Sequence, residues 1–182
     1  MGVVVNPPTS DAADAAVGPL VERLAAALLL RNWTLVTAES CTGGMIAAAC
    51  TDLAGSSQWF ERGLVTYSNQ AKSELLGVDA ELIKRLGAVS EDVARAMAAG
   101  ARQRARADVA VAVTGVAGPS GGSADKPVGT VWFGWDVQGD VSSELQHFGG
   151  DRAAVRQATL CHALQRLLAL VDARAAPTTV VS

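Results

Sequence analysis

An almost unbroken aliphatic run over residues 108–113, DVAVAV, constrains the fold of this chain more than any other feature. A short strand with almost no polar positions is typical of the middle of an α/β sheet, where helices cover both faces. Segments with apolar residues at three- and four-residue spacing, such as residues 17–28, supply candidate covering helices. We therefore expect an α/β protein in which residues 108–113 form a central strand.

Strand and helix patterns alternate along the rest of the chain. Further strands are expected over residues 33–37, 63–67, 130–137 and 141–148, with a hairpin turn at Gln138 and Gly139. Helices are expected after residue 13, from residue 151 onward, and over residues 45–53, 69–76, 79–86 and 90–104. The candidate N-caps are Ser68 or Asn69, Ser90 and Asp151. This order indicates a single α/β domain with a mixed sheet.

The two ends of the chain differ from its centre in composition. Pro7 and Pro8 stand among small and polar residues, so we expect residues 1–13 to be a mobile N-terminal tail. Residues 14–173 are expected to form the domain, and residues 174–182 a C-terminal tail.

Charge and cysteine usage narrow the class of protein. The chain has 15 Lys and Arg against 18 Asp and Glu, and this net charge of −3 argues against direct nucleic-acid binding. The longest aliphatic run, residues 24–30, is much shorter than the ~18 residues of a membrane span.

The N-terminus has no signal-peptide pattern, and 3 cysteines without C-x-x-C spacing suit a reducing compartment, so we expect a cytoplasmic protein. The 2 histidines form no cluster that would bind a metal.

Three polar clusters directly follow three of the expected strands. They are residues 39–42, 67–69 and 114–115. Open α/β sheets bind ligands at the carboxyl edge, and parallel strands end at the same edge. If these strands are parallel, the three clusters lie close together and form one site.

Ser40 is the candidate nucleophile of that site. It stands just before Gly43, Gly44 and a helix start, where free backbone N–H groups are able to hold an oxyanion. The alternative is that Ser40 or Thr42 only caps the helix. Cys41 is a rival nucleophile, because a helix N-terminus lowers the pKa of a thiol.

Lys72 is the candidate base for a serine nucleophile. The chain has few histidines, and Lys72 lies one turn into the helix that follows the second strand. Its pKa must fall by ~3 units for it to accept a proton near pH 7, which requires an enclosed pocket. The alternative for Lys72 is an exposed surface position. Tyr67 either orients this lysine or relays its proton, or it packs in the core.

Anion binding has two candidate sites. The loop from Thr114 to Gly129 is long and rich in glycine and proline, and its N–H groups are suited to an anion. Arg152 and Arg156 begin the last helix and are candidate phosphate ligands, with solvated surface charges as the alternative. A third arginine cluster is expected to form a solvated face: Arg102, Arg104 and Arg106.

Six short sequence blocks stand in a recognisable order. They are AESCTGG (38–44), GSSQWFERG (55–63), VTYSNQAK (65–72), GAVSE (87–91), TGVAGPSGG (114–122) and KPVGTVW (126–132). Together they resemble the C-terminal domain of the competence/damage-inducible protein family. The resemblance implies a three-layer α/β/α sandwich with a mixed, mostly parallel sheet, often assembled as a homodimer.

The same resemblance implies an activity and a set of site residues. Stand-alone members of the family are amidases without cofactor or metal that convert nicotinamide mononucleotide to nicotinic acid mononucleotide and ammonia. Carried over to this chain, Ser40 is the nucleophile, Lys72 the general base and Tyr67 an assisting residue. Backbone N–H groups near Gly43 and Gly44 would hold the oxyanion. The substrate-binding residues would be Thr42, Gly43, Gly44, Asn69, Thr114, Gly115, Gly118 and, at the phosphate, Arg152.

Two alternatives to the serine amidase are considered. The first is a catalytically silent nucleotide-binding module that acts in competence or DNA-damage responses through a protein partner. The second is a thiol amidase that uses Cys41. If the serine amidase is correct, the side chains of Ser40 and Lys72 are expected to lie within hydrogen-bonding distance of each other.

Overall fold

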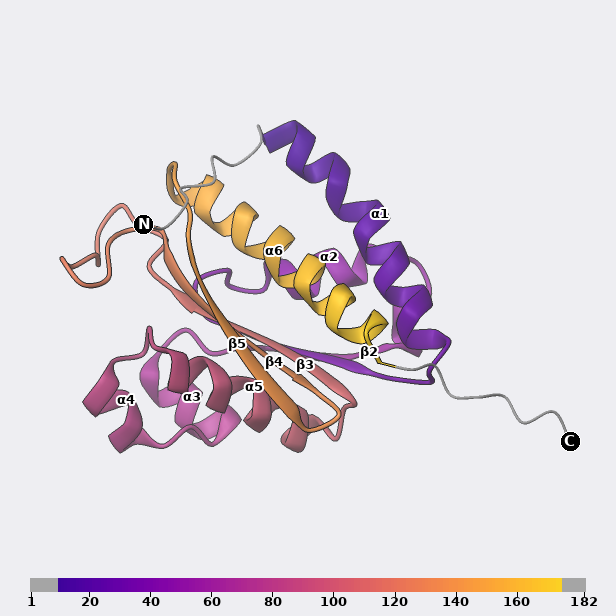
Figure 1. The fold of residues 1–182 in the computed structure, drawn as a ribbon, viewed down its shortest axis with the longest axis horizontal. Coiled ribbons are helices and arrows are strands. Elements are labelled where there is room, and N and C mark those ends of the chain that lie inside the picture. Colours follow the sequence, from indigo (N-terminus) through magenta and orange to yellow (C-terminus); the bar gives the residue numbers. More distant parts are fainter. Residues whose placement is uncertain (1–9, 175–182) are drawn as a thin grey trace, which may run out of the picture.

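The computed structural model describes residues 10–174, with side chains from residue 17 onward. Within these residues, a five-stranded sheet in the order β2-β1-β3-β4-β5 lies between two layers of helices (Figure 1). The strands are β1 Leu35–Glu39, β2 Phe60–Val65, β3 Val109–Gly115, β4 Thr130–Val137 and β5 Asp140–His147. The helices are α1 Ser10–Leu29, α2 Met45–Thr51, η1 Ser56–Gln58 (a short 3-10 helix), α3 Asn69–Leu76, α4 Ala80–Leu86, α5 Glu91–Ala105 and α6 Arg152–Asp172.

The sheet is mixed, and one strand opposes the direction of the others. β1 pairs with β2 and with β3 in parallel, whereas β4 is antiparallel to both β3 and β5. Because β5 is antiparallel to β4, it runs in the same direction as β1, β2 and β3. The predicted fold class, a three-layer sandwich with a mixed, mostly parallel sheet, is therefore confirmed.

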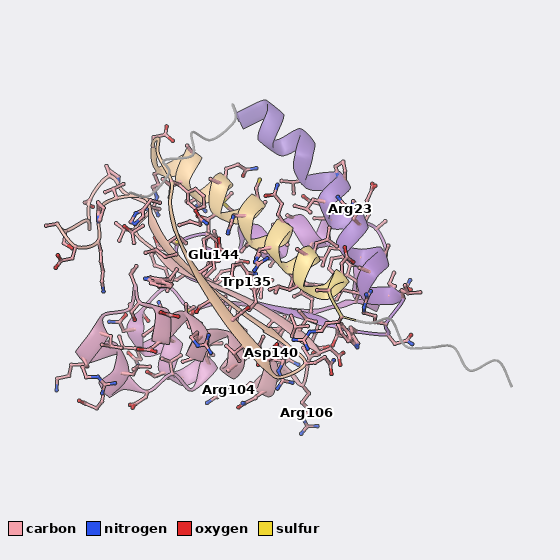
Figure 2. The ribbon with its side chains drawn as sticks, viewed as in Figure 1. Arg23, Arg104, Arg106, Trp135, Asp140 and Glu144 are labelled. Atoms are coloured by element: carbon pink, nitrogen blue, oxygen red, sulfur yellow. The ribbon has the colours of Figure 1, made fainter. Side chains whose placement is uncertain are left out.

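The two faces of β3 explain how the layers pack. Its valines belong to the core beneath α1, α2 and α6, and its alanines belong to the core above α5 (Figure 1). The face with small side chains lets α5 approach closely, since a Cβ at Gly134 of β4 would lie 2.2 Å from the carbonyl oxygen of Ala94. On the other face, Trp135 lies buried between the sheet and α6 (Figure 2).

β1 and β2 are displaced from the predicted strands. β1 extends to Glu39, two residues beyond the predicted end, and β2 covers residues 60–65 instead of 63–67. The prediction ended β1 at Thr37 because polar residues follow, but the side chains of Thr37 and Glu39 are completely buried. A buried polar residue remains in a strand when its hydrogen bonds are satisfied, and the apolar pattern cannot report this.

The other predicted elements agree with the structure to within a few residues, and the hairpin turn lies at Gln138 and Gly139. Ser68 and Asp151 are the N-caps of α3 and α6, and each side chain accepts a hydrogen bond from a backbone N–H of the first turn. α1 begins at Ser10, inside the segment expected as a tail. Residues 1–9 and 175–182 of the expected tails lie outside the described residues.

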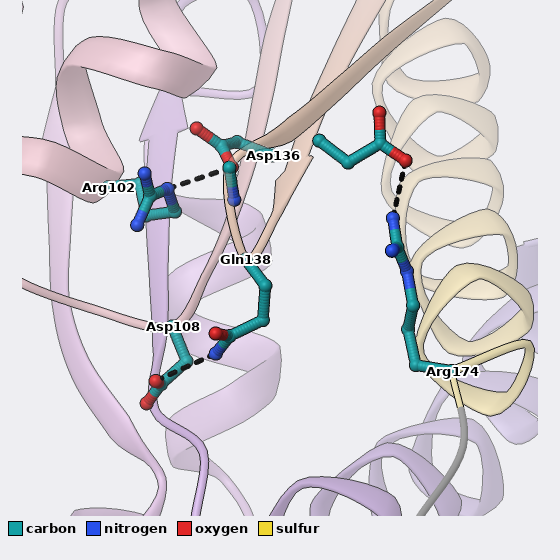
Figure 3. Close-up of polar contacts among 7 residues, drawn as sticks. Arg102, Asp108, Asp136, Gln138 and Arg174 are labelled. Atoms are coloured by element: carbon teal, nitrogen blue, oxygen red, sulfur yellow. Dashed lines mark hydrogen bonds and ion pairs between the residues drawn. The ribbon is translucent and has the colours of Figure 1, made fainter.

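The expectation of a solvated arginine face on α5 is wrong for Arg102. Its Nε lies 2.8 Å from Oδ1 of Asp136, a buried carboxylate of β4. Figure 3 shows this ion pair beside the hydrogen bond from Gln138 to Asp108, and both contacts attach the β4–β5 hairpin to its neighbours. Arg104 and Arg106 lie exposed at the end of α5 (Figure 2). A helical position alone could not reveal the carboxylate opposite Arg102.

The helices within residues 10–174 include none that is both long and apolar enough to cross a membrane.

Candidate active site

Ser40 follows β1 directly and lies at the carboxyl edge of the sheet. Its backbone N–H donates to the carbonyl of Val113 in β3 at 3.1 Å, which fixes the residue between two parallel strands. The Nζ of Lys72, in the first turn of α3, lies 3.1 Å from Ser40 Oγ. The predicted contact between these side chains is therefore present.

The environment of Lys72 favours a neutral amine. The residue is 1% exposed, so its alternative as a surface lysine is wrong. Its Nζ donates to the carbonyl of Thr66 at 2.8 Å, and it forms no ion pair with a carboxylate of the described residues. Burial lowers the pKa of Lys72 from its usual 10.5, with the nearby Cys41 opposing this effect. A neutral amine has one lone pair, which is available to accept the Ser40 proton.

The turn that carries Ser40 is held by Glu39, a residue whose role the sequence did not indicate. Its buried carboxylate accepts hydrogen bonds from the hydroxyl of Thr42 at 2.6 Å and from the N–H groups of Gly44, Ile46 and Ala47 at 3.0, 3.0 and 2.8 Å. α2 has no capping side chain at Gly44, its own N-cap position. Glu39 therefore replaces the missing cap from the preceding strand.

The hydrogen bonds of this turn show that the expectation of Gly43 and Gly44 as oxyanion donors is wrong. The N–H of Gly44 is bound to Glu39, and the N–H of Gly43 donates to the carbonyl of Ser40 at 3.1 Å. Both glycines adopt positive φ, 62° and 102°, so the turn requires residues without a Cβ. Within the described residues, the backbone N–H groups of this turn without a hydrogen-bonded oxygen are those of Cys41 and Thr42, and the N–H of Cys41 contacts its own thiol.

Cys41 is poorly suited to act as the nucleophile. The residue is 6% exposed, and burial raises the pKa of its thiol to about 11. The thiolate is the reactive form of cysteine, and a thiol with this pKa is almost entirely protonated near neutral pH. The hydrogen bond of Lys72 Nζ goes to Ser40 Oγ. The geometry thus favours serine over cysteine chemistry.

The side chains of Tyr67 and Arg152 are hydrogen-bonded to each other. Tyr67 is 62% exposed, which is not the core packing considered from the sequence. Its hydroxyl accepts a hydrogen bond from Nη2 of Arg152 at 2.9 Å, and Nη1 of Arg152 donates to the carbonyl of Gly118 at 2.9 Å. Tyr67 has no hydrogen bond to Lys72. Its hydroxyl thus contacts an arginine and not the lysine.

A cavity of about 650 Å³ adjoins this contact. Its lining includes the apolar side chains of Ala117, Pro119 and Val128 and the charged residues Asp151, Arg152 and Arg156. Nη2 of Arg156 donates to the carbonyl of Thr42 at 2.8 Å, so one lining residue of the cavity contacts the turn that carries Ser40. Its volume lies within the usual range for small-molecule sites, about 300–1,000 Å³.

The remaining predicted site residues lie in different surroundings. Thr114 is buried, and its hydroxyl donates to the carbonyl of Ala88 at 2.9 Å, which fixes the end of β3. Gly115 allows close packing of β4, since a Cβ there would lie 2.7 Å from a methyl group of Val131. Asn69 is exposed and lines a separate cavity between α3 and α4. None of the three contacts Ser40 or Lys72 through a hydrogen bond.

These features define the class of protein. It is an α/β protein in which a serine and a buried lysine are in contact at the carboxyl edge of a mostly parallel sheet. The part of the chain with described side chains holds no group of three or more His, Cys, Asp or Glu that could bind a metal ion. The family model of the CinA C-terminal domain matches residues 18–171, and the chain belongs to this family.

Named relatives and solved structures agree with this membership. A protein of Enterobacter agglomerans named nicotinamide-nucleotide amidohydrolase PncC is 56% identical over 146 residues, 80% of this chain and 89% of the relative. The protein of the same name from Escherichia coli K12 is 52% identical over 155 residues, 85% of this chain and 94% of the relative. The crystal structure of the competence/damage-inducible protein CihA from Agrobacterium tumefaciens is similar with a TM-score of 0.83 and 43% identity, covering 92% of this chain and 99% of that one.

Proposed function

We propose that this chain is a serine–lysine amidohydrolase that converts nicotinamide mononucleotide to nicotinic acid mononucleotide and ammonia. The observation that carries this proposal is the 3.1 Å contact between Ser40 Oγ and the buried Nζ of Lys72. The names of the two relatives supply the substrate class. A contact between nucleophile and base is the arrangement that activates a serine hydroxyl.

The first half of the reaction forms an acyl-enzyme. Neutral Lys72 takes the proton of Ser40, and Oγ forms a bond to the carboxamide carbon. The negative charge that develops on the amide oxygen is stabilised by the N–H groups of Cys41 and Thr42, which replace the donors expected at Gly43 and Gly44. Protonated Lys72 then gives its proton to the amide nitrogen, the C–N bond breaks, and ammonia leaves.

The second half reverses the roles of the same groups. Neutral Lys72 takes a proton from water, and the hydroxide attacks the acyl carbon to form a second oxyanion. The bond to Ser40 Oγ breaks as Lys72 returns the proton to it, which releases nicotinic acid mononucleotide. Since burial lowers the pKa of Lys72, the lysine is able to alternate between the two protonation states.

Arg152 is proposed to hold the phosphate of the nucleotide. Arg152 lines the cavity, and its guanidinium donates hydrogen bonds to the hydroxyl of Tyr67 and the carbonyl of Gly118. The first N–H groups of α6 point the positive end of the helix dipole toward the same cavity. Arg152→Met is expected to raise KM for the mononucleotide at least about tenfold and to leave the phosphate-free nucleoside unaffected.

The decisive experiment measures ammonia release from nicotinamide mononucleotide by the purified chain in the presence of a chelator, with free nicotinamide as a second substrate. We expect release from the mononucleotide only. Ser40→Ala is expected to lower the rate about 10³-fold or more, and Cys41→Ala, the matched control at the next position, to retain activity.

Each other outcome points to a different function. Loss of activity in Cys41→Ala but not in Ser40→Ala would establish a thiol amidase. Binding of the mononucleotide by the folded wild-type chain without ammonia release would establish a silent nucleotide-binding module that acts through a protein partner.

The proposal also covers assembly and compartment. We expect a homodimer, as the resemblance to the family implies, and analytical ultracentrifugation measures this directly. We expect a cytoplasmic protein, because its cysteines are free and two of them, Cys41 and Cys50, are buried. Fractionation of cells that produce the protein tests this point.

A further inference from the structure

A line of hydrogen bonds connects Arg156 with the backbone beside the nucleophile. Nη2 of Arg156 donates to the carbonyl of Thr42 at 2.8 Å. That carbonyl belongs to the same peptide unit as the N–H of Gly43, which donates to the carbonyl of Ser40 at 3.1 Å. The Ser40 carbonyl in turn shares a peptide unit with the N–H of Cys41. The guanidinium is thus linked through two peptide units to a proposed oxyanion donor.

We propose that Arg156 is a positioning residue that orients and polarises the N–H of Cys41 as an oxyanion donor, an inference that rests on the proposed function. A cation that donates to a carbonyl polarises that peptide unit and makes its N–H a stronger donor. The same effect passes to the next peptide unit, because hydrogen bonds in a chain strengthen one another. The oxyanion then meets a donor that is already fixed and polarised before the reaction.

The surroundings of Arg156 support this role. Its side chain is half-buried, and its Nε is buried without a hydrogen-bond partner among the described residues, so this part of the guanidinium is removed from water. Its positive charge reaches the Ser40–Cys41 segment, since it lowers the pKa of the Cys41 thiol against the larger rise caused by burial. A charge in a partly dry environment acts more strongly on its neighbours than a solvated charge.

The two arginines at the start of α6 have different partners. Arg152 is exposed and donates to Tyr67 and Gly118. Arg156, one turn later, donates to the turn of Ser40. Both line the same cavity, so Arg156 as a second phosphate ligand is the competing explanation. The two roles predict different kinetics. Loss of a phosphate ligand impairs only the substrate that carries the phosphate, whereas loss of a positioning residue impairs both substrates.

The test compares Arg156→Met and Arg156→Lys with a control variant, Arg166→Met, which removes an exposed arginine farther along the same helix. Steady-state kinetics are measured with nicotinamide mononucleotide and with the nucleoside that lacks its phosphate. We expect Arg156→Met to lower kcat about tenfold on both substrates with little change in KM, less than the 10²–10³-fold loss of an entire donor. Arg156→Lys should recover part of kcat, and Arg166→Met should change neither parameter.

A second measurement does not depend on the identity of the natural amide. A small fluorophosphonate reacts with an activated serine: Ser40 Oγ forms a bond to phosphorus, its proton passes to Lys72, and fluoride leaves. The phosphoryl oxygen occupies the oxyanion position, so Arg156→Met should slow the labelling of Ser40 about tenfold. This result is expected even if nicotinamide mononucleotide proves not to be the substrate, which separates a failure of this inference from a failure of the proposed function.

Two results would overturn the inference. A loss that appears in KM for the mononucleotide and vanishes with the nucleoside makes Arg156 a phosphate ligand. Equal labelling rates for wild type and a folded Arg156→Met variant, judged by circular dichroism, show that Arg156 does not affect the oxyanion donors.

Discussion

The amine of Lys72 is buried in surroundings that destabilise its charged form. It is 1% exposed and has a hydroxyl and a carbonyl as partners, without an opposing carboxylate among the described residues. Burial of a cation without a counter-ion favours its neutral form, and this neutral form is what a general base requires. The cost to stability and the benefit to catalysis therefore have the same physical origin.

Lys72→Met should separate these two effects. The folded state releases the Lys72 proton at a lower pH than the unfolded chain, whose lysine has the usual pKa of 10.5. The unfolded chain thus binds more protons between the two pKa values, and wild-type stability rises with pH there. The variant lacks this penalty, so it should be more stable than wild type by about 1–2 kcal/mol near neutral pH, although inactive.

Urea unfolding of both proteins at several pH values measures this difference. The gap should narrow as the pH rises toward 10.5, and well above this pH the lysine is neutral in both states. In parallel, the amidase rate of the wild type should rise with pH through the lowered pKa of Lys72. A variant that is less stable than wild type at every pH would show that the hydrogen bonds of Lys72 outweigh the cost of its burial.

At the scale of elements, the segment from β1 to α2 depends on a carboxylate in the strand. α2 has seven residues and lacks a side-chain cap of its own, and Glu39 accepts hydrogen bonds from three of its N-terminal N–H groups. The first N–H groups of a helix have no partner within the helix, so an acceptor from elsewhere stabilises its start. Glu39 thereby fixes the turn in which Ser40 stands.

Glu39→Gln should weaken this segment without changing its volume. The amide has one acceptor oxygen where the carboxylate has two, and its NH₂ group faces backbone donors. We expect a loss of about 2–3 kcal/mol in the free energy of unfolding, together with a fall in kcat, because Ser40 is less well fixed. Urea titration and steady-state kinetics measure the two effects.

The matched control for this variant is Glu61→Gln in β2. Glu61 is exposed and pairs with its neighbour Arg62, so its loss should change stability by less than about 0.5 kcal/mol. If the two variants were equally stable, Glu39 would not be the cap of α2.

At the scale of the molecule, the β4–β5 hairpin is attached to the helical layers by polar contacts at its turn. Asp136 lies in the end of β4 and is paired with Arg102 of α5, and Arg174 after α6 pairs with Asp140 of β5 (Figure 3). Asp136 also accepts the N–H of Gly139 in the turn at 2.8 Å. These contacts join both layers to one hairpin, on the opposite edge of the sheet from Ser40.

Arg102→Met should test the importance of this attachment. It leaves the carboxylate of Asp136 buried without its cation, which is expected to cost about 3–5 kcal/mol in the free energy of unfolding. The double variant with Asp136→Asn should recover part of the loss, because the uncompensated charge is gone. Arg106→Met, at an exposed position of the same segment, serves as the control in denaturant unfolding. A single variant as stable as this control would mean that water already reaches Asp136.

Most of the fold could be predicted because the information is local. The aliphatic run of β3, the helical spacing in α5 and α6, and the turn at Gln138 and Gly139 each depend on neighbouring residues. The positions of Ser40 and Lys72 also followed from sequence, since polar residues after parallel strands meet at one edge. The boundaries of β1 and β2 did not, because Thr37 and Glu39 are polar residues whose burial depends on distant donors.

The sequence by itself determined the periodicities, the turn glycines and the residue types that are able to perform chemistry. The tertiary structure alone decided the polar contacts that no sequence pattern indicated. It brought Arg156 to Thr42 across 114 positions, gave Gly43 and Gly44 internal partners, and paired Arg102 with a buried carboxylate. The physical reason is that a hydrogen bond requires two atoms within about 3 Å, and packing of whole layers sets that distance.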